Sequence, residues 1–168
     1  MMLTDPKKDV KEESVIDVDL SPIRKKRFRI NGDDEKILEL NVSDLNIFVR
    51  LNDAYPKLDK LAHDAIEKLP DEDADVTDLE STNEIAKTLT EIDSEMRNLL
   101  DYIFDAPVSE VCASEGSMYD PFGGKLRYEH ILETLSALYE NNLNAEVKKM
   151  TQRVNKHTAK YTKSRAKK

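Results

Sequence analysis

The sequence lacks tryptophan, has a single cysteine and contains only four glycines in 168 residues. One cysteine excludes an internal disulfide and fits a reducing compartment. No run of about 18 apolar residues occurs, so we expect no transmembrane helix. The polar N-terminal stretch also lacks the apolar segment of a secretory signal. Apolar residues make up 39% of the chain and charged residues 36%, which predicts a thin helical core rather than a broad doubly wound sheet.

Charge is distributed unevenly along the chain. Residues 148–168 contain nine Lys or Arg and no Asp or Glu. Removing these nine from the 26 basic residues leaves 17 against 34 acidic ones, so the rest of the chain carries a formal charge of −17. An acidic body with a basic tail is typical of an interaction tail, whose target would be nucleic acid, an acidic partner or the acidic body of a neighbouring copy. The candidate electrostatic residues are Lys148, Lys149, Arg153, Lys156, Lys160, Lys163 and Arg165.

The stretch from Arg27 to Leu69 predicts a β-hairpin that leads directly into a helix with one apolar face. Asn31-Gly32 separates two short apolar runs, and a type I′ turn needs positive φ at both of its central residues. The acidic residues that follow predict a longer or bulged tip. A short strand over residues 15–20 would give the hairpin a third member, which helps because an isolated hairpin is marginal in water.

The helix after the hairpin has two features that predict its form. Ser43 or Asn41 is expected to cap its first turn. Pro56 cannot donate to the helix ladder, so the apolar pattern around it predicts either one bent helix or two stacked helices. The acidic stretch Pro70–Thr82 that follows predicts an exposed loop.

Three further helices are predicted beyond that loop. The first spans Asn83–Phe104, capped by Thr82 or Asn83, because apolar residues recur there at alternating steps of four and three. A short helix is expected within 108–115. The last runs from Arg127 to about Thr158, longer than so small a body needs, so its basic half either projects or frays.

Together these patterns predict a mainly α fold of the α+β type. It has a small N-terminal β-hairpin followed by a bundle of about four helices, the last of them long and basic. Residues 1–24 are expected to form a flexible arm with at most one short strand, and 25–147 a single domain. Residues 148–168 form the basic helix end and tail.

Residue chemistry offers no catalytic or cofactor-binding constellation, so we expect no enzyme, metal or cofactor. Asp59, His63 and Glu67 share a helix face that could hold a divalent ion weakly, but a solvated face with pairs of opposite charge is favoured. His130 and Glu133 reverse the order that di-iron bundles use, and no second copy occurs. Cys112 has no cationic neighbour and is expected to be a small buried side chain.

Two loops resemble known ligand-binding motifs but fail their tests. The acidic loop beginning at Asp71 has Val76 and Thr82 where an EF-hand needs glycine and glutamate. Gly123-Gly124-Lys125 lacks the first glycine and the Ser or Thr of a phosphate-binding loop. We instead expect that turn to set Phe122 against the core.

Three stretches resemble a family of tail assembly chaperones of long-tailed phages of Gram-positive bacteria. They are RFRINGDDEKILELNVSDLNIFVRLNDAYPKL from residue 27, FDAPVSEVCASEGSMYDPFGGKLRYEHILETL from residue 104 and VNKHTAKYTK from residue 154. The resemblance spans most of residues 27–163, without the acidic insert 70–82 or the arm before Ile23. It rests on the order and texture of these segments rather than on invariant chemistry.

The resemblance implies a protein that coats the helical tape-measure protein in the host cytoplasm until the tail tube polymerises around it. Such a protein needs amphipathic surfaces for helices, and no active site or membrane contact. Self-association is a further expectation, and nucleic acid is a weaker candidate partner. Rival hypotheses are a minor structural tail or neck protein of the virion and an acidic inhibitor of a host nucleic-acid-binding protein. The candidate partner-binding residues are Ile85, Leu89, Ile92, Met96, Leu99, Ile131, Leu135 and Leu138.

Overall fold

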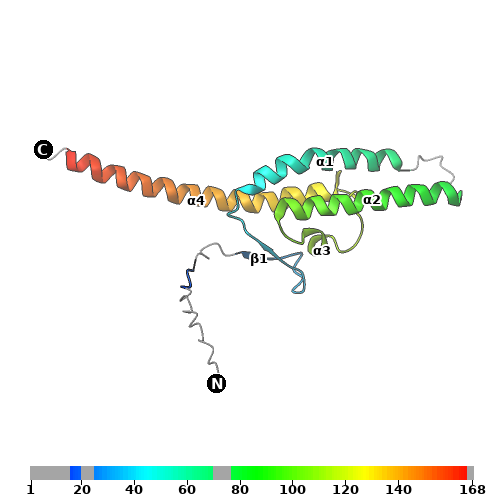
Figure 1. Ribbon diagram of the computed structural model, residues 1–168, viewed down its shortest axis with the longest axis horizontal. Coiled ribbons are helices and arrows are strands. Elements are labelled where there is room, and N and C mark those ends of the chain that lie inside the picture. The colour runs from blue at the N-terminus through cyan, green and yellow to red at the C-terminus, as the bar shows by residue number, and fades with distance from the viewer. Residues whose placement is uncertain (1–15, 20–24, 70–76, 166–168) are drawn as a thin grey trace, which may run out of the picture.

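The computed structural model describes residues 16–19, 25–69 and 77–165, with side chains described up to residue 156. Helices α1 (Asn46–Lys68) and α2 (Leu79–Phe104) lie side by side against the first part of α4 (Arg127–Arg165), as Figure 1 shows. The β-hairpin and the five-residue helix α3 (Val108–Cys112) adjoin these helices. The predicted mainly α fold, with a small N-terminal hairpin and four helices of which the last is long, is confirmed.

The hairpin pairs β1 (Lys26–Arg29) with β2 (Ile37–Leu40) in antiparallel register, with Phe28 opposite Leu38. Asn31 and Gly32 adopt φ values of 52° and 74°, which confirms the predicted turn. The backbone N–H of Ile30 donates to the carbonyl oxygen of Lys36 at 2.9 Å, so the tip is longer than two residues, as expected. Residues 16–19 form no strand, and the described sheet at the hairpin has only two strands.

The first turn of α1 is held by Asp44, so the prediction of Ser43 or Asn41 as the cap is wrong. Asp44 Oδ1 accepts from the backbone N–H of Asn46 at 2.9 Å, and Asp44 Oδ2 accepts from Arg50 Nη2 at 2.9 Å. Asn41 instead accepts from the N–H of Ser43 at 3.3 Å. The N-cap residue itself, Leu45, makes no side-chain cap, and Asp44 just before it is the residue whose carboxylate meets the start of the helix.

Pro56 lies inside α1, and the helix continues on both sides of it to Lys68. Figure 1 shows a single helix that bends along its length. Of the two predicted arrangements, the bent helix is therefore the one that forms.

Helix α2 begins at Leu79, four residues before the predicted start, because Asp78 caps it. Asp78 Oδ1 accepts from the backbone N–H of Glu80 at 3.2 Å, and Asp78 Oδ2 accepts from Ser81 Oγ at 2.8 Å. The prediction of Thr82 or Asn83 as the cap is wrong, because the first turn of this helix is exposed and carries no apolar periodicity. The predicted end at Phe104 is confirmed.

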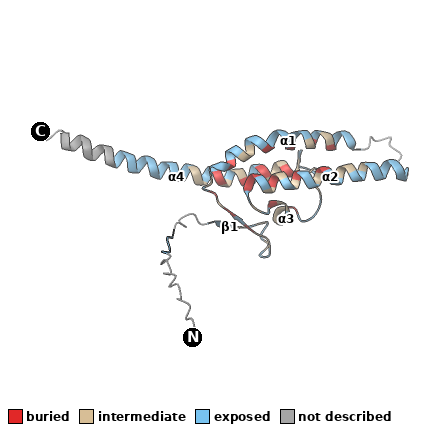
Figure 2. Cartoon of the chain, viewed as in Figure 1, coloured by how far each residue is buried: buried red, intermediate tan, exposed pale blue. Residues whose placement is uncertain are grey.

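Buried side chains gather where α1, α2 and the first half of α4 meet (Figure 2). Helix α1 contributes three alanines to this face, Ala54, Ala62 and Ala65, whose small size allows α2 to approach closely. On α4, Tyr139 is buried against Phe104, with ring centroids 5.9 Å apart. Each fully buried large apolar side chain contributes roughly 1.5–3 kcal/mol, which makes this three-helix junction the main stabilising region.

The segment between α2 and α4 contains a second, unpredicted hairpin of β3 (Pro121–Phe122) and β4 (Lys125–Leu126). Its turn carries Phe122 outward, where the side chain is 73% exposed. The expectation that Phe122 packs against the core is therefore wrong, and Met118, just before the hairpin, is the side chain buried there.

Arg97 on α2 fastens this segment to the helix. Its Nη1 donates to the carbonyl oxygen of Ala113 at 2.7 Å and its Nη2 to that of Gly116 at 2.6 Å. Arg97 Nε also pairs with Asp93 Oδ2 at 2.6 Å, and Asp93 Oδ1 accepts from the backbone N–H of Met118 at 2.6 Å. The Arg97–Asp93 ion pair thus ties the loop that leads to α4 to helix α2.

Helix α4 has 39 residues and leaves the body near Asn142. The Nδ2 group of Asn142 donates to the carbonyl oxygen of Val42 and to Ser43 Oγ, both at 3.2 Å, and its Oδ1 accepts from Lys26 Nζ at 2.9 Å. From residue 144 to 156 every side chain is exposed (Figure 2). The basic half therefore projects as a helix, which decides between the two predicted alternatives.

Candidate functional site

A groove of about 500 Å³ lies between the first hairpin and α4. Three of the predicted partner-binding residues line it from one face of α4, at steps of four and three. Apolar side chains from both hairpins complete its wall, which consists of Phe28, Ile30, Phe122, Ile131, Leu135 and Leu138. The groove is thus an apolar surface close to the core that no described element fills.

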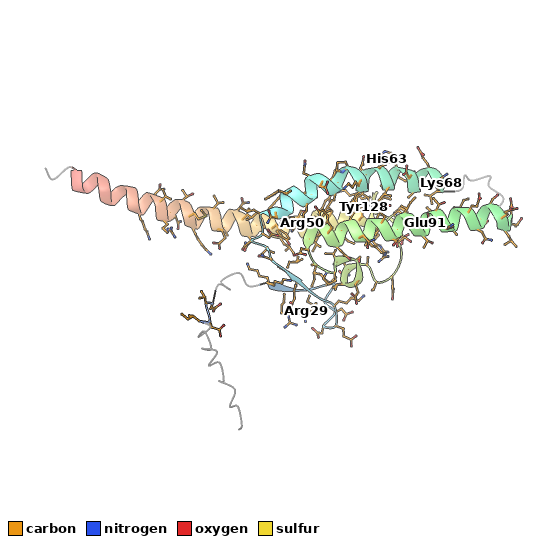
Figure 3. All side chains as sticks on the ribbon, in the orientation of Figure 1. Arg29, Arg50, His63, Lys68, Glu91 and Tyr128 are labelled. Carbon is orange, nitrogen blue, oxygen red and sulfur yellow. The ribbon has the colours of Figure 1, made fainter. Side chains whose placement is uncertain are left out.

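Polar groups surround this apolar floor. Thr134, Arg29 and Asn31 stand at its edges, and Figure 3 labels Arg29 on the hairpin. His130 Nε2 lies 2.6 Å from the carbonyl oxygen of Phe122, and the two rings meet edge to face with centroids 5.4 Å apart. The histidine therefore holds the second hairpin in place beside the groove.

Cys112 also lines the groove and is half-buried, as its expected role as a small core side chain requires. Burial raises the pKa of its thiol to about 11, and the nearby Asp101 carboxylate adds to that shift. The reactive thiolate is therefore scarce at neutral pH.

Leu135 on α4 is 3% exposed and belongs to the core while it lines the groove, whereas none of the predicted residues on α2 lines this groove. Ile92 and Met96 are buried in the core, while Leu89 and Leu99 are half-buried and pack against it. Helix α1 covers this seam, so it is closed as a partner-binding surface in this structure. Ile85 is the exception, because it lines a second groove between the far ends of α1 and α2.

Of the candidate electrostatic residues, Lys148, Lys149, Arg153 and Lys156 are exposed on the projecting half of α4. Lys149 Nζ pairs with Glu146 Oε1 at 2.8 Å. Lys160, Lys163 and Arg165 lie on the helical backbone, but their side chains fall outside the described ones.

The weak metal candidates do not come together as a site. His63 Nδ1 lies 2.9 Å from the carbonyl oxygen of Asp59, and this hydrogen bond, with the Asp59 carboxylate, raises the pKa of the imidazole. Glu133 pairs with Lys125 Nζ at 2.6 Å rather than with His130. Among the residues that the structure describes, no group of three or more His, Cys, Asp or Glu side chains is placed to hold a metal ion. The acidic residues at 71–75 lie outside that part of the chain.

Sequence reasoning missed three contributors to the groove, Phe28, Ile30 and Phe122. The alternation of Phe28 and Ile30 with charged residues was a usable signal, because it marks one apolar face of the first strand. Within the described ranges, no helix combines the length and apolar character needed to cross a membrane. No protein-family model, curated protein or solved structure matches this chain.

Proposed function

We propose that this chain is a tail assembly chaperone of a long-tailed phage and binds the tape-measure protein non-covalently in the host cytoplasm. The observation that carries the proposal is the apolar groove between the first hairpin and α4. There Ile131, Leu135 and Leu138 from one helix stand with Phe28 and Ile30 from the hairpin.

A groove of this kind suits an amphipathic helix. Such a helix inserts apolar side chains spaced at i, i+3 or i+4 and i+7 into an apolar floor, while its polar flanks meet a polar rim. Arg29, Asn31 and Thr134 supply that rim. A tape-measure protein, which is long and helical, offers many such faces.

Two properties of the whole chain support the same function. The order of its segments over most of residues 27–163 resembles that of the tail assembly chaperone family. Its formal charge of −8 favours solubility while apolar client surface is bound. Such binding requires shape and charge, and no covalent chemistry.

The test is co-expression of this protein with the tape-measure protein encoded in the same genome, followed by measurement of the soluble fraction. We expect the wild type to keep the tape-measure protein soluble and to co-purify with it. Thr134→Arg places a long charged side chain at the groove and should reduce co-purification at least tenfold. Phe122→Ala removes an exposed wall residue and should also weaken it.

Phe48→Ala is the matched control, because Phe48 is also exposed but lies on α1 and does not line the groove. Groove variants that co-purify as well as this control would show that the groove is not the binding site. An insoluble tape-measure protein in the presence of the wild type would refute the chaperone function itself. Stoichiometric amounts of this protein in purified particles would replace it with a structural role in the virion.

A further inference from the structure

The projecting half of α4 carries an exposed apolar stripe within a basic sequence. Val147, Met150 and Val154 are 59%, 66% and 61% exposed, and their spacing of three and four places them on one helix face. Residues 143–156, which we call the basic arm, contain four basic residues and one acidic residue, a formal charge of +3. Its single acidic residue, Glu146, is already paired with Lys149.

The far ends of α1 and α2 have the opposite character. Residues 64–69 and 77–91, which we call the acidic tip, contain six acidic and two basic residues, a formal charge of −4. Three large apolar side chains of the tip are exposed, Ile66, Leu69 and Leu79. The tip therefore carries the charge opposite to that of the basic arm, together with exposed apolar side chains of its own.

A groove of about 490 Å³ lies at the acidic tip between the two helices. Ile85 from α2 lines it together with the charged side chains of Lys68, Glu84, Lys87 and Glu91, so the lining itself is formally neutral. Figure 3 labels Lys68 and Glu91 on the two helices. The charge that opposes the basic arm therefore belongs to the acidic tip as a whole, and the exposed apolar side chains of the tip can cover the apolar stripe of the arm.

The basic arm and the acidic tip lie at opposite ends of the long axis of the molecule (Figure 1). The arm points away from the body, so it does not reach the tip of its own chain. Two basic arms would repel each other, which disfavours a symmetric contact between arms. The arrangement therefore favours contact between the arm of one copy and the tip of another.

We propose that copies of this protein associate head to tail, with the basic arm of one copy seated on the acidic tip of the next. Because the two surfaces differ, each copy keeps one free surface after the contact forms. A heterologous contact of this type continues into a ring or an open chain rather than stopping at a dimer. This inference concerns surfaces outside the hairpin groove, so it does not depend on which client protein the groove binds.

The test uses two charge-reversed variants of the full chain. Lys148→Glu with Arg153→Glu makes the arm acidic, and Glu84→Lys with Glu91→Lys makes the tip basic. All four side chains are exposed, so both variants should fold, which circular dichroism checks. Sedimentation velocity of the wild type at about 50 mM salt should show assemblies larger than dimers, which dissociate at 0.5 M salt as screening shortens the range of the attraction.

Each variant alone should sediment as a monomer at concentrations where the wild type assembles. An equimolar mixture should assemble again, because each basic surface then finds an acidic one. As a control, Lys60→Glu reverses an exposed charge on α1 outside both the basic arm and the acidic tip, and it should assemble like the wild type. A monomeric wild type at low salt, assembly by either variant alone, or a mixture that stays monomeric would each overturn the proposal. A wild type that stops at symmetric dimers and ignores reversal of the tip would show contact between arms instead.

Discussion

Replacing Arg97 by alanine tests whether one guanidinium group holds the loop before α4 onto α2. Its hydrogen bonds reach the Asp93 carboxylate at 2.6 Å and the carbonyl oxygens of Ala113 and Gly116 at 2.7 and 2.6 Å. Asp93 in turn accepts from the backbone N–H of Met118 at 2.6 Å. Arg97 Nη1 also donates to the carbonyl oxygen of Ser109 at 3.4 Å, so the substitution takes the Arg97 donors away from three carbonyl groups and a carboxylate.

The expected loss follows from these contacts and from their exposure. A hydrogen bond to a charged group contributes about 1.5–3 kcal/mol, and removing one partner of a fully buried ion pair costs about 3–5 kcal/mol. The Arg97 and Asp93 side chains keep 23% and 19% of their surface exposed, so water compensates for part of the loss. We expect the free energy of unfolding to fall by about 3 kcal/mol, which lowers Tm by roughly 6–12 °C in a chain of this size.

Urea denaturation followed by circular dichroism at 222 nm measures this difference. Arg97→Lys keeps the charge but loses the planar fork, so its loss should lie between those of the wild type and the alanine variant. Arg153→Ala, an exposed site on the projecting helix, should change stability by less than about 0.5 kcal/mol. A loss below about 1 kcal/mol for Arg97→Ala, or an equal loss for Arg153→Ala, would refute the assigned role of the network.

Three further predictions concern single residues. Gly116→Ala should lower the free energy of unfolding by about 2 kcal/mol, because φ is +74° and the added Cβ would lie 2.5 Å from Asp120 Oδ2. Gly32 also has φ +74° but faces open space, so Gly32→Ala should lower the free energy of unfolding by less in the same urea titration. Cys112 should react with a thiol reagent about 100-fold more slowly at pH 8 than an ordinary cysteine, because its pKa rises from 9.0 to about 11 and the reactive thiolate becomes correspondingly rarer. A rate within tenfold of that of a model thiol would contradict this. Burial alone would raise the pKa of Asp44, but the Arg50 side chain and the Asn46 N–H outweigh it and hold that pKa below 3.8. Its stabilisation is therefore present above pH 3.8 and is lost as pH falls through the lower folded value. Asp44→Asn should destabilise the protein at pH 7 and match the wild type in strong acid, as urea titrations at both pH values would show.

Features set by local chemistry were predictable from the sequence. The Asn31-Gly32 turn formed as expected because few residue pairs accept positive φ at both positions. The end of α2 at Phe104 and the long last helix were also predicted from the apolar spacing. Helix starts were harder, because several side chains near each start can cap and only the path of the preceding chain selects among them. Asp78 caps α2, and Asp44, one residue before the N-cap of α1, accepts from Asn46, in place of the neighbours that the sequence favoured.

Half of the candidate site could be recognised from apolar spacing, and half could not. Ile131 and Leu135, predicted from their spacing as partner-binding residues, line a groove, although the hairpin that forms its opposite wall was not assigned to it. Ile92 and Met96 show the same spacing but are buried, because α1 covers that face of α2. Periodicity identifies an apolar face without revealing whether the same chain covers it. The outward position of Phe122 depends on a hairpin whose strands have two residues each, too short to leave a periodic signal in the sequence.

The ties at Asn142 make the rest of α4 a lever arm. Arg165 lies 23 residues beyond Asn142, so this part of α4 is about 35 Å long at ~1.5 Å per residue. A tilt of ~10° about Asn142 would move its end by roughly 6 Å, while residues near the pivot shift by less than the length of a bond. Small adjustments in the three hydrogen bonds of Asn142 are therefore amplified at the far end of the helix.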